Sequence, residues 1–503
     1  MELVNFVPRP YQLSIVETCK QKNTLVVLPT GTGKTPIALM LAAHRLAVVP
    51  GSKILITAPT KPLCNQHVQS FRQSSTLGED IAIVNGSVPP EKRRTIWEHA
   101  RVVIATPQTI ESDLKEGRIS LQDVSLLCLD ECHRSRQKYA NTTVVRSYLE
   151  QAKSPRILAL TASPGSSKER VDEIYKNLAI EAVEIRTEED EEMKPFVQKK
   201  EFIWLPIDLP ESIMQVAVPL RKVYKSLLGK LQGFGYNKPV EYINKRDVLL
   251  MQKQLQGQVR QGNPAAFYGL SLVAQIIKLD HLIMLLETQS LRAAHGYWQK
   301  LLSEETKAAR VLTGNSDIQQ GLAKVRLLLD AGTVHPKMDC LLSLIRGELE
   351  KTPDARMIIF ANYRDTVAEI TEVLQANNIT AIRFVGQADK GIDKGQKQPE
   401  QAAILQRFRD KEFSVLTASS VGEEGLDLPE VHAVIFYEPV ASELRKVQRA
   451  GRTARTREGK IIFLMAKKTM DEAYYWVSLR KEKKMKSLLQ GLQKKQETQA
   501  RLL

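Results

Sequence analysis

The chain has 503 residues, of which 43% are hydrophobic and 26% charged, and its formal net charge is +15. This length is too great for one hydrophobic core and predicts two to four domains, while the composition is that of an ordinary globular protein and excludes a largely membrane-embedded one. The charge favours a polyanionic partner such as nucleic acid, and general solubility explains it about as well.

The longest apolar stretch, at 270–286, contains Lys278, Asp280 and His281. These polar residues favour a buried helix over a membrane span. The first residues lack the basic, apolar and small-residue order of a signal peptide, and the five cysteines form no regular framework. We therefore expect a cytoplasmic protein with no membrane partner.

Residues 1–203 are predicted to form a first α/β domain. Its apolar runs each end in a glycine, a proline or a polar turn, and helical patterns of roughly twenty residues separate them. The runs lie at 24–29, 53–59, 81–86, 102–107, 126–131 and 157–163. This pattern predicts a parallel sheet whose ligands bind at the carboxyl ends of its strands. The acidic segment 186–195 is interpreted as a connector without a strand.

Helical spacing then dominates residues 204–335, which are predicted to form an all-helical insertion. Apolar runs return in residues 336–480 and predict a second parallel α/β domain. These runs lie at 357–362, 381–386, 414–419, 433–439 and 460–466. Residues 481–503 are predicted to form a basic C-terminal helix with a solvated face. The predicted fold class is therefore α/β, with two parallel-sheet domains and a helical domain between them.

The segment LPTGTGKT follows an apolar run and precedes a helical pattern. Gly31, Gly33, Lys34 and Thr35 match the second half of a phosphate-binding loop, whose glycines let backbone N–H groups surround a phosphate. Lys34 would contact the β- and γ-phosphate oxygens, and Thr35 would bind Mg²⁺. Leu28 stands where the general pattern has a glycine, so a turn that matches by chance is the alternative.

The segment LLCLDECHRS permits two interpretations. In the first, Asp130 ends a strand and completes the Mg²⁺ shell, and Glu131 orients or deprotonates the attacking water. In the second, the two cysteines and the histidine bind zinc. The zinc interpretation lacks a second pair of close ligands, because the other cysteines are scattered along the chain. We prefer the first interpretation and expect Cys128 to be a buried packing residue.

The segment QRAGRTAR supplies positive charge for phosphoryl transfer. Arg452 and Arg455 are spaced to share one helical face, and an arginine finger from the second α/β domain would tie hydrolysis to domain closure. A solvated or phosphate-binding surface is the alternative for an arginine-rich helix. Because the other α/β domain contains the nucleotide loop, we prefer the arginine-finger interpretation.

The motifs TGTGKT, APTKPL, ATPQT, DECH, TAS, SVGEEGLDLPE and QRAGRTAR occur in the order found in superfamily 2 helicases. The chain resembles that superfamily, which implies two RecA-like domains that clasp ATP. The helical insertion, with the segments HPKMD, FVGQA, FYEPV and DEAYYW, makes it most similar to the archaeal Hef and Fanconi anaemia M helicase group. Dicer and the RNA-sensor helicases share the position of the insertion and often the DECH spelling.

This resemblance implies ATP and Mg²⁺ as cofactors, branched or forked DNA as the partner, and a nucleoid-associated location. Gln12 resembles an adenine-contacting glutamine. Ser163 and its neighbour Thr161 are implied to link hydrolysis to strand movement, and we expect His133 to relay contact to the second domain. The implied ATP-binding residues are Arg9, Gln12, Thr30, Gly31, Thr32, Gly33, Lys34, Thr35, Gly425 and Asp427. The implied catalytic residues are Lys34, Asp130, Glu131, Gln448, Arg452 and Arg455.

The same resemblance places nucleic-acid contacts at strand ends in both α/β domains. Such ends present backbone N–H groups and small hydroxyls, which suit sugar–phosphate contacts that read no bases. For any one of these segments an ordinary turn is an equally good interpretation. The implied contacts are Thr60, Lys61, Pro62, Thr106, Pro107, Asn362, Arg364, Gly386, Gln387, Ser419, Val421 and Gly422.

Alternatives to a branched-DNA helicase remain open. An RNA helicase or duplex-RNA translocase would carry similar motifs, since a 2′-OH contact is invisible in the sequence. A scaffold that only clamps nucleic acid is disfavoured, because the catalytic residues are all present.

Archaeal Hef relatives commonly continue into a nuclease module that is not found here, so nuclease activity is not predicted. In the insertion, either a duplex grip or a solvated face explains the basic residues Lys222, Lys225, Lys245 and Arg246.

Overall fold

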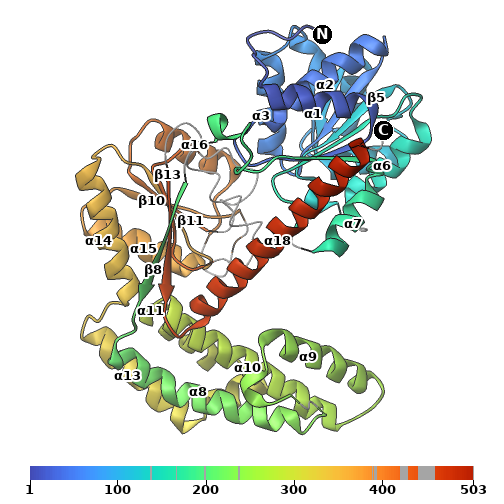
Figure 1. Cartoon of the computed structure of the whole chain (residues 1–503). Coiled ribbons are helices and arrows are strands. Elements are labelled where there is room, and N and C mark those ends of the chain that lie inside the picture. Colours follow the sequence, from blue (N-terminus) through green and yellow to red (C-terminus); the bar gives the residue numbers. More distant parts are fainter. Residues whose placement is uncertain are drawn as a thin grey trace.

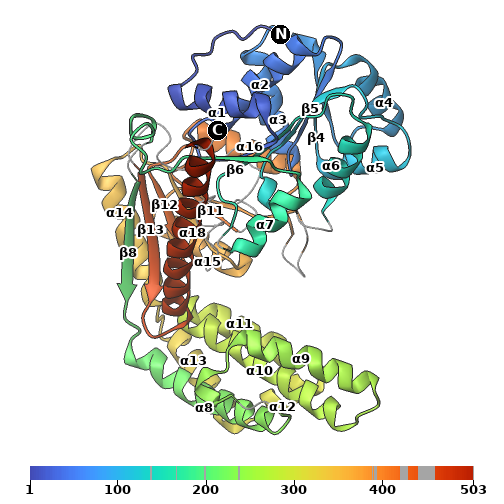
Figure 2. The ribbon, with the colours of Figure 1, turned by 45° about the vertical axis from the view of Figure 1, so that its right-hand side comes forward.

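The computed structural model describes residues 1–135, 139–165, 167–197, 200–235, 238–387, 389, 394–419, 429–439 and 459–501. Within these ranges the chain forms two parallel-sheet domains and a bundle of helices (Figure 1). A long helix, α18 (Met470–Arg501), runs from the second sheet domain to the first, as Figures 1 and 2 both show. This is the predicted α/β fold with a helical insertion.

Domain 1 is built on a seven-stranded sheet with the order β3-β4-β2-β5-β6-β1-β7, in which every pair is parallel. Its central strands are buried on both faces, which explains their unbroken apolar sequences. Because the strands are parallel, their carboxyl ends all lie along the same edge of the sheet, and so do the segments that follow them. The strands are β1 (Thr24–Val27), β2 (Lys53–Thr57), β3 (Ile81–Val84), β4 (Val102–Ala105), β5 (Val124–Leu129), β6 (Ile157–Thr161) and β7 (Ala182–Ile185).

Helices cover both faces of this sheet. One buried cluster includes Tyr11, Ile37 and Phe71 from the first three helices, and the other includes Trp97 and Tyr148 from later helices. Successive residues of each strand alternate between the two clusters, as a strand requires. The helices are α1 (Pro10–Gln21), α2 (Lys34–Val48), α3 (Lys61–Gln73), α4 (Pro90–His99), α5 (Pro107–Lys115), α6 (Ala140–Gln151) and α7 (Lys168–Asn177).

The helical bundle occupies most of the predicted insertion. Its helices are α8 (Glu211–Gln232), α9 (Lys245–Arg260), α10 (Ala265–Thr288), α11 (Leu291–Leu302), α12 (Lys307–Thr313) and α13 (Ser316–Asp330). By length and composition alone, α10 could cross a membrane. It packs against α8, α9, α11 and α12, so its apolar residues form the centre of the bundle.

Domain 2 is built on a six-stranded parallel sheet with the order β10-β11-β9-β12-β13-β8. Its strands are β8 (Lys200–Ile207), β9 (Met357–Phe360), β10 (Ala381–Phe384), β11 (Val415–Ala418), β12 (Ala433–Phe436) and β13 (Gly459–Ala466). Helices α14 (Pro336–Lys351) and α15 (Arg364–Ala376) pack on one face, and α16 (Gln398–Arg409) packs on the other.

The structure corrects two predicted boundaries and adds strand β7. The boundary at 203 is wrong, because β8 pairs with β13 along its whole length and belongs to the sheet of domain 2. Strand β8 lies at the edge of this sheet. An edge strand tolerates Pro206, because the missing N–H can face away from the neighbouring strand. The separate helix predicted at 481–503 is also wrong. Helix α18 is continuous from Met470, and Leu489 is buried against domain 1 instead of facing solvent.

Candidate nucleotide site and nucleic-acid interface

The predicted phosphate loop joins β1 to α2. Gly31 and Gly33 have φ values of 81° and 87°, in the left-handed region that glycine adopts without strain. A Cβ atom on Gly33 would lie 2.4 Å from Nε2 of Gln12. Lys34 is the first residue of α2, and its Nζ donates to the carbonyl of Leu28 at 3.2 Å. The loop therefore leads into a helix N-terminus, where backbone N–H groups can bind phosphate.

Side chains from the start of α1 hold this loop from outside. Nε2 of Gln12 donates to the carbonyl of Gly33 at 3.1 Å, while its Oε1 accepts the N–H of Arg9 at 2.9 Å. The hydroxyl of Tyr11 donates to the carbonyl of Thr32, and Nη1 of Arg9 lies 3.4 Å from the same oxygen. Arg9 and Gln12 thus shape the loop. A contact between Gln12 and adenine stays a prediction.

Asp130 follows β5 and is 9% exposed. Its Oδ2 lies 2.9 Å from Nε2 of His67 on α3, and its Oδ1 accepts the N–H of Glu131 at 2.9 Å. Burial by itself would raise the pKa of Asp130. The hydrogen bond and charge of His67 and the charge of Lys34 outweigh burial, so this pKa lies below the ordinary aspartate value. The carboxylate is therefore held ionised in a fixed orientation.

Glu131 begins a chain of contacts that ends at Ser163. Its Oε2 lies 3.2 Å from Nδ1 of His133, and the same nitrogen lies 3.1 Å from Oγ1 of Thr161. That hydroxyl accepts the N–H of Ser163 at 3.1 Å. The predicted coupling residues are thus brought together at the ends of β5 and β6. These contacts lie within domain 1, so a relay from His133 to domain 2 stays a prediction.

The donors expected for Mg²⁺ meet at this edge of the sheet. Thr35 lies in the first turn of α2, the helix after β1, and Asp130 follows β5, which is separated from β1 only by β6. Hydroxyl and carboxylate oxygens are the ligands that Mg²⁺ prefers. Asp130 is also held ionised, which is the form of a carboxylate that binds a divalent cation. The residues therefore fit a magnesium site.

The cysteines of the DECH region lie on opposite faces of the sheet. Cys128 belongs to the cluster with the first three helices, and Cys132 belongs to the other cluster. Burial raises the pKa of both thiols well above the usual value, which opposes the thiolate form that binds zinc. Cys128 is the buried packing residue that was predicted.

The domain 1 residues predicted to contact nucleic acid follow β2 and β4. Thr60 is the N-cap residue of α3 and Thr106 is the N-cap residue of α5. Strand β2 lies beside β5, and β4 is the next strand beyond β2. Lys61 and Pro62 are half-buried. Pro107 is buried, because it packs as the first residue of α5. Its side chain is not available for the predicted contact, which leaves Thr106 and the neighbouring backbone.

The domain 2 residues predicted to contact nucleic acid meet at the ends of β9, β10 and β11, which are neighbours in the sheet. Asn362 and Gln387 are exposed, whereas Gly386 and Ser419 are buried. Nη2 of Arg364 donates to the carbonyl of Gly386 at 2.7 Å. The sheet therefore gathers these residues, and exposure favours Asn362 and Gln387 as direct contacts.

The remaining predicted residues lie outside the described part of the chain, and their roles stay predictions. They are Val421, Gly422, Gly425, Asp427, Gln448, Arg452 and Arg455.

Sequence reasoning missed His67, which contacts the predicted metal ligand. His67 shares the inward face of α3 with Cys64 and Phe71, at helical spacing. This spacing could have shown that the imidazole points inward. It could not have shown that the end of β5 lies beneath it, because the adjacency of β2 and β5 sets that position.

The fold and the site together define a two-domain phosphate-loop protein of the RecA-like type. Family models match in the expected order: "DEAD/DEAH box helicase" at 9–171, "Putative ATP-dependent RNA helicase, helical bundle" at 214–330 and "Helicase conserved C-terminal domain" at 336–457. The crystal structure of the Pyrococcus furiosus Hef helicase domain is 44% identical, with a TM-score of 0.73, over 94% of this chain and 98% of that one. The chain belongs to the superfamily 2 helicases, in the Hef and Fanconi anaemia M group.

Longer curated relatives carry both DNA and RNA names. A Methanocaldococcus jannaschii protein named "Putative ATP-dependent RNA helicase" is 39% identical over 96% of this chain and 61% of its own length. The "ATP-dependent DNA helicase fml1" of Schizosaccharomyces pombe is 32% identical, over 92% of this chain and 57% of its own length. This chain thus spans about three fifths of these two relatives.

Proposed function

We propose that the chain is the motor of an ATP-dependent DNA helicase or translocase that acts on branched DNA. Its substrates would be forks, flaps and Holliday junctions met in repair or replication restart, in a cytoplasmic, nucleoid-associated setting. The supporting observation is one shared sheet edge in domain 1. Strands β1, β5 and β6 end at the expected nucleotide residues. Strand β2 lies beside β5, β4 lies beside β2, and these two strands end at the expected nucleic-acid contacts. In this proposal a movement at the nucleotide residues is transmitted along this edge to the nucleic-acid contacts.

In this proposal each residue of the nucleotide site has one role. Lys34 leaves the carbonyl of Leu28 to contact phosphate oxygens, and Thr35 and Asp130 hold Mg²⁺. The bound cation neutralises charge on the phosphate oxygens. Glu131 orients the attacking water and accepts its proton. His133 and Thr161 pass the resulting change along the sheet edge.

Domain 2 completes the site in this proposal. Gln448, Arg452 and Arg455 face the phosphates, and the two arginines supply positive charge to the group being transferred. Hydrolysis then requires the two sheet domains to close. Each closure changes the spacing between the two sets of nucleic-acid contacts and moves the strand by a step.

The bundle supplies a grip on DNA beside the branch point. Arg246, Lys253 and Arg260 are exposed on α9 at seven-residue spacing, which places them on one face. Such a row of cations binds phosphates. At the start of α10, Phe267 and Tyr268 are 64% and 51% exposed, and exposed aromatic rings can stack on unpaired bases.

The other basic residues expected in the grip are less suited to it. Nζ of Lys222 lies 4.0 Å from Asp317, and Nζ of Lys245 lies 3.9 Å from Asp280. These carboxylates offset part of their charge. Lys225 is exposed and stays a candidate.

RNA is the second candidate substrate, and the printed name of the M. jannaschii relative is the observation in its favour. The names of the S. pombe relative and of other DNA helicases favour DNA. A panel of substrates separates the two. ATP turnover is measured with single strands, blunt duplex, forks and four-way junctions, each made in DNA and in RNA. The largest stimulation is expected from forked and four-way DNA.

Glu131→Gln is the control for the assigned chemistry. It should lower turnover about a hundredfold or more, as loss of a general base does. Unchanged turnover would contradict the roles given above. Equal stimulation by every substrate would exclude the branched-DNA proposal, and stronger stimulation by RNA would select the alternative.

A further inference from the structure

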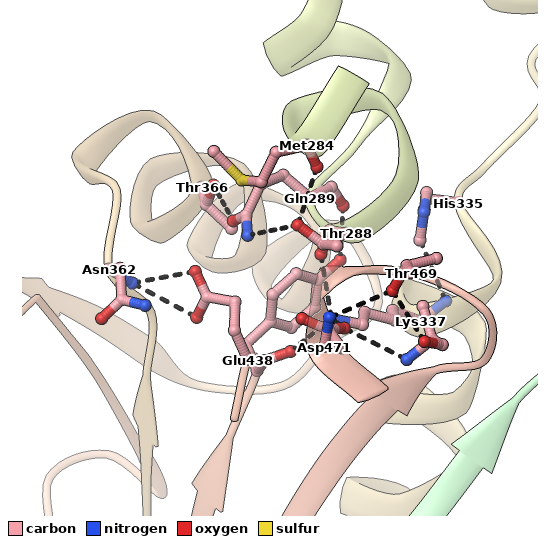
Figure 3. Close-up of polar contacts among 12 residues, drawn as sticks. Met284, Thr288, Gln289, His335, Lys337, Asn362, Thr366, Glu438, Thr469 and Asp471 are labelled. Carbon is pink, nitrogen blue, oxygen red and sulfur yellow. Dashed lines mark hydrogen bonds and ion pairs between the residues drawn. The ribbon is translucent and has the colours of Figure 1, made fainter. Parts of the chain in front are cut away.

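Helix α18 begins inside a buried junction between domain 2 and the bundle. Asp471, in its first turn, is 2% exposed and forms an ion pair with the fully buried Lys337. Nζ of Lys337 also donates to the carbonyls of Thr288, at the end of α10, and Tyr437, after β12, at 2.9 Å each (Figure 3). A single ammonium group therefore joins the bundle, the sheet of domain 2 and α18.

The same helix ends its described packing on domain 1. Leu489 is buried in the domain 1 cluster, and Met485 and Leu492 pack against that cluster. The hydroxyl of Ser163 donates to the sulfur of Met485 at 3.0 Å. Figures 1 and 2 agree on this path from β13 to the side of domain 1 that carries α7. Helix α18 therefore contacts both sheet domains.

The contact point in domain 1 is one end of the chain of contacts in the nucleotide site. The hydroxyl of Thr161 accepts the N–H of Ser163 at 3.1 Å and donates to its carbonyl at 3.0 Å. Thr161 in turn contacts His133, which contacts Glu131. Met485 therefore contacts the last residue of this series of contacts, so a displacement of α18 at Met485 acts directly on Ser163.

We infer that α18 is a strut that couples the nucleotide site to the helical bundle, and that Met485 is the positioning residue at its domain 1 end. A helix of this length spans about 48 Å, and its hydrogen-bonded backbone transmits movement along its axis. The domain 2 end is a fully buried ion pair. Among the side chains that the structure describes, those of Met485, Leu489 and Leu492 hold the domain 1 end through apolar packing and one sulfur contact, which break more readily than a buried ion pair.

This inference rests on the proposed function, because it needs ATP-driven closure of the two sheet domains. When domain 2 moves toward the nucleotide, Asp471 stays fixed to Lys337, and α18 moves with domain 2 and the bundle. The contact between Met485 and Ser163 must then break or rotate. The bundle therefore changes position at the same moment as the hydroxyl of Ser163 changes partner.

The test weakens the contact between α18 and domain 1 with two variants, Met485→Ala and Leu489→Ala. The matched control is Gln490→Ala, at a neighbouring position that is exposed. We expect fork-stimulated ATP turnover to persist. The ATP consumed per strand separated should rise about fivefold, within the range of coupling mutations. Fluorescent labels at Glu91→Cys on α4 and Arg260→Cys on α9, in a Cys340→Ser background, should report a broader distance distribution.

Met485→Leu keeps the apolar volume and lacks the sulfur, so it should fold like the wild type and lie between the wild type and Met485→Ala in ATP consumed per strand. If thermal melting shows that the alanine variants unfold, Met485→Leu is the variant that tests the coupling through α18. Wild-type ATP consumption and an unchanged distance distribution in the folded variants would overturn the inference. A wild type without fork-stimulated turnover would contradict the proposed function instead.

Discussion

At the scale of single residues, His67 controls the orientation of the Asp130 carboxylate. Its Nε2 lies 2.9 Å from Oδ2 of Asp130, and both side chains are buried. We predict that His67→Ala raises the Mg²⁺ concentration needed for half-maximal nucleotide binding about tenfold, because residues that orient metal ligands typically contribute that much. The Mg²⁺ dependence of fluorescent ADP binding measures this effect, and a turnover titration supports it.

His99→Ala is the matched control, because His99 is an exposed histidine on α4 whose Nδ1 contacts the carbonyl of Thr95 at 2.8 Å. It should leave the Mg²⁺ dependence unchanged. If His67→Ala matched the wild type as well, the carboxylate would not depend on the imidazole.

Glu438 makes stability depend on pH. It follows β12, and its Oε1 accepts the N–H of Asn362 at 3.1 Å (Figure 3). Burial raises its pKa from 4.5 to about 7, although the charge of Lys337 opposes this. The folded chain therefore binds this proton more tightly than the unfolded chain. The free energy of unfolding falls as pH rises through this window, and the loss is complete above the folded pKa.

We predict that Glu438→Gln removes this pH dependence. Its stability relative to the wild type should grow by about 3 kcal/mol between the lower and upper ends of the window, since each pKa unit corresponds to about 1.4 kcal/mol. Melting temperatures of both proteins at pH 5 and pH 8 measure the difference. A difference that is the same at both pH values would show that Glu438 titrates normally.

The nucleotide residues could be predicted because their chemistry is contiguous in the sequence. Gly31, Gly33 and Lys34 stand within four positions, and Asp130 directly precedes Glu131. His67 could not be predicted, because its contact depends on which strand lies beside β2. Local spacing does not encode strand order, and non-local pairing sets it.

At the scale of elements, long periodic segments were predicted well and short or mixed segments were not. The bundle helices have apolar residues at regular helical spacing over several turns, which identifies them. Strand β7 has four residues, and β8 contains Pro206 and finds its partner β13 only after the whole insertion. The burial of Leu489 on α18 also depends on a distant surface, so the local charge pattern suggested a solvated helix.

Helix α9 carries the clearest prediction at this scale. We expect Arg246→Glu combined with Lys253→Glu to weaken binding of forked DNA. The slope of log Kd against log salt concentration should decrease by about one for each DNA phosphate that the variant no longer neutralises. Fluorescence anisotropy at several salt concentrations measures both quantities.

Arg326→Glu combined with Lys324→Glu on α13 is the control, because both side chains are exposed, they belong to another helix of the same bundle, and the change in net charge is the same. It should change affinity and slope much less. Equal effects of the two variants would show that the bundle contributes only its net charge, with no dedicated face.

At the scale of the whole molecule, the junction around Lys337 makes the bundle and domain 2 a single body. The hydroxyl of Tyr437 donates to the carbonyl of Gln289 at 2.9 Å, and Oγ1 of Thr366 donates to Oε1 of the same residue at 2.8 Å (Figure 3). Surface pairs such as Arg292 with Glu372, at 2.9 Å, extend this contact. These partners are far apart in the sequence, so no local pattern could predict that they meet.

Lys337 is therefore expected to be a main determinant of the stability of this body. Lys337→Met leaves the carboxylate of Asp471 buried without its cation, which should lower the free energy of unfolding by about 3–5 kcal/mol. Adding Asp471→Asn removes the unpaired buried charge, so the double variant should be more stable than Lys337→Met alone.

The control is Lys467→Met, which breaks a surface ion pair with Asp208, where the two side chains are 40% and 76% exposed. It should lower the free energy of unfolding by less than about 1 kcal/mol. Urea unfolding of the four proteins measures these differences. Equal losses for Lys337→Met and Lys467→Met would mean that the buried junction does not hold the bundle on domain 2.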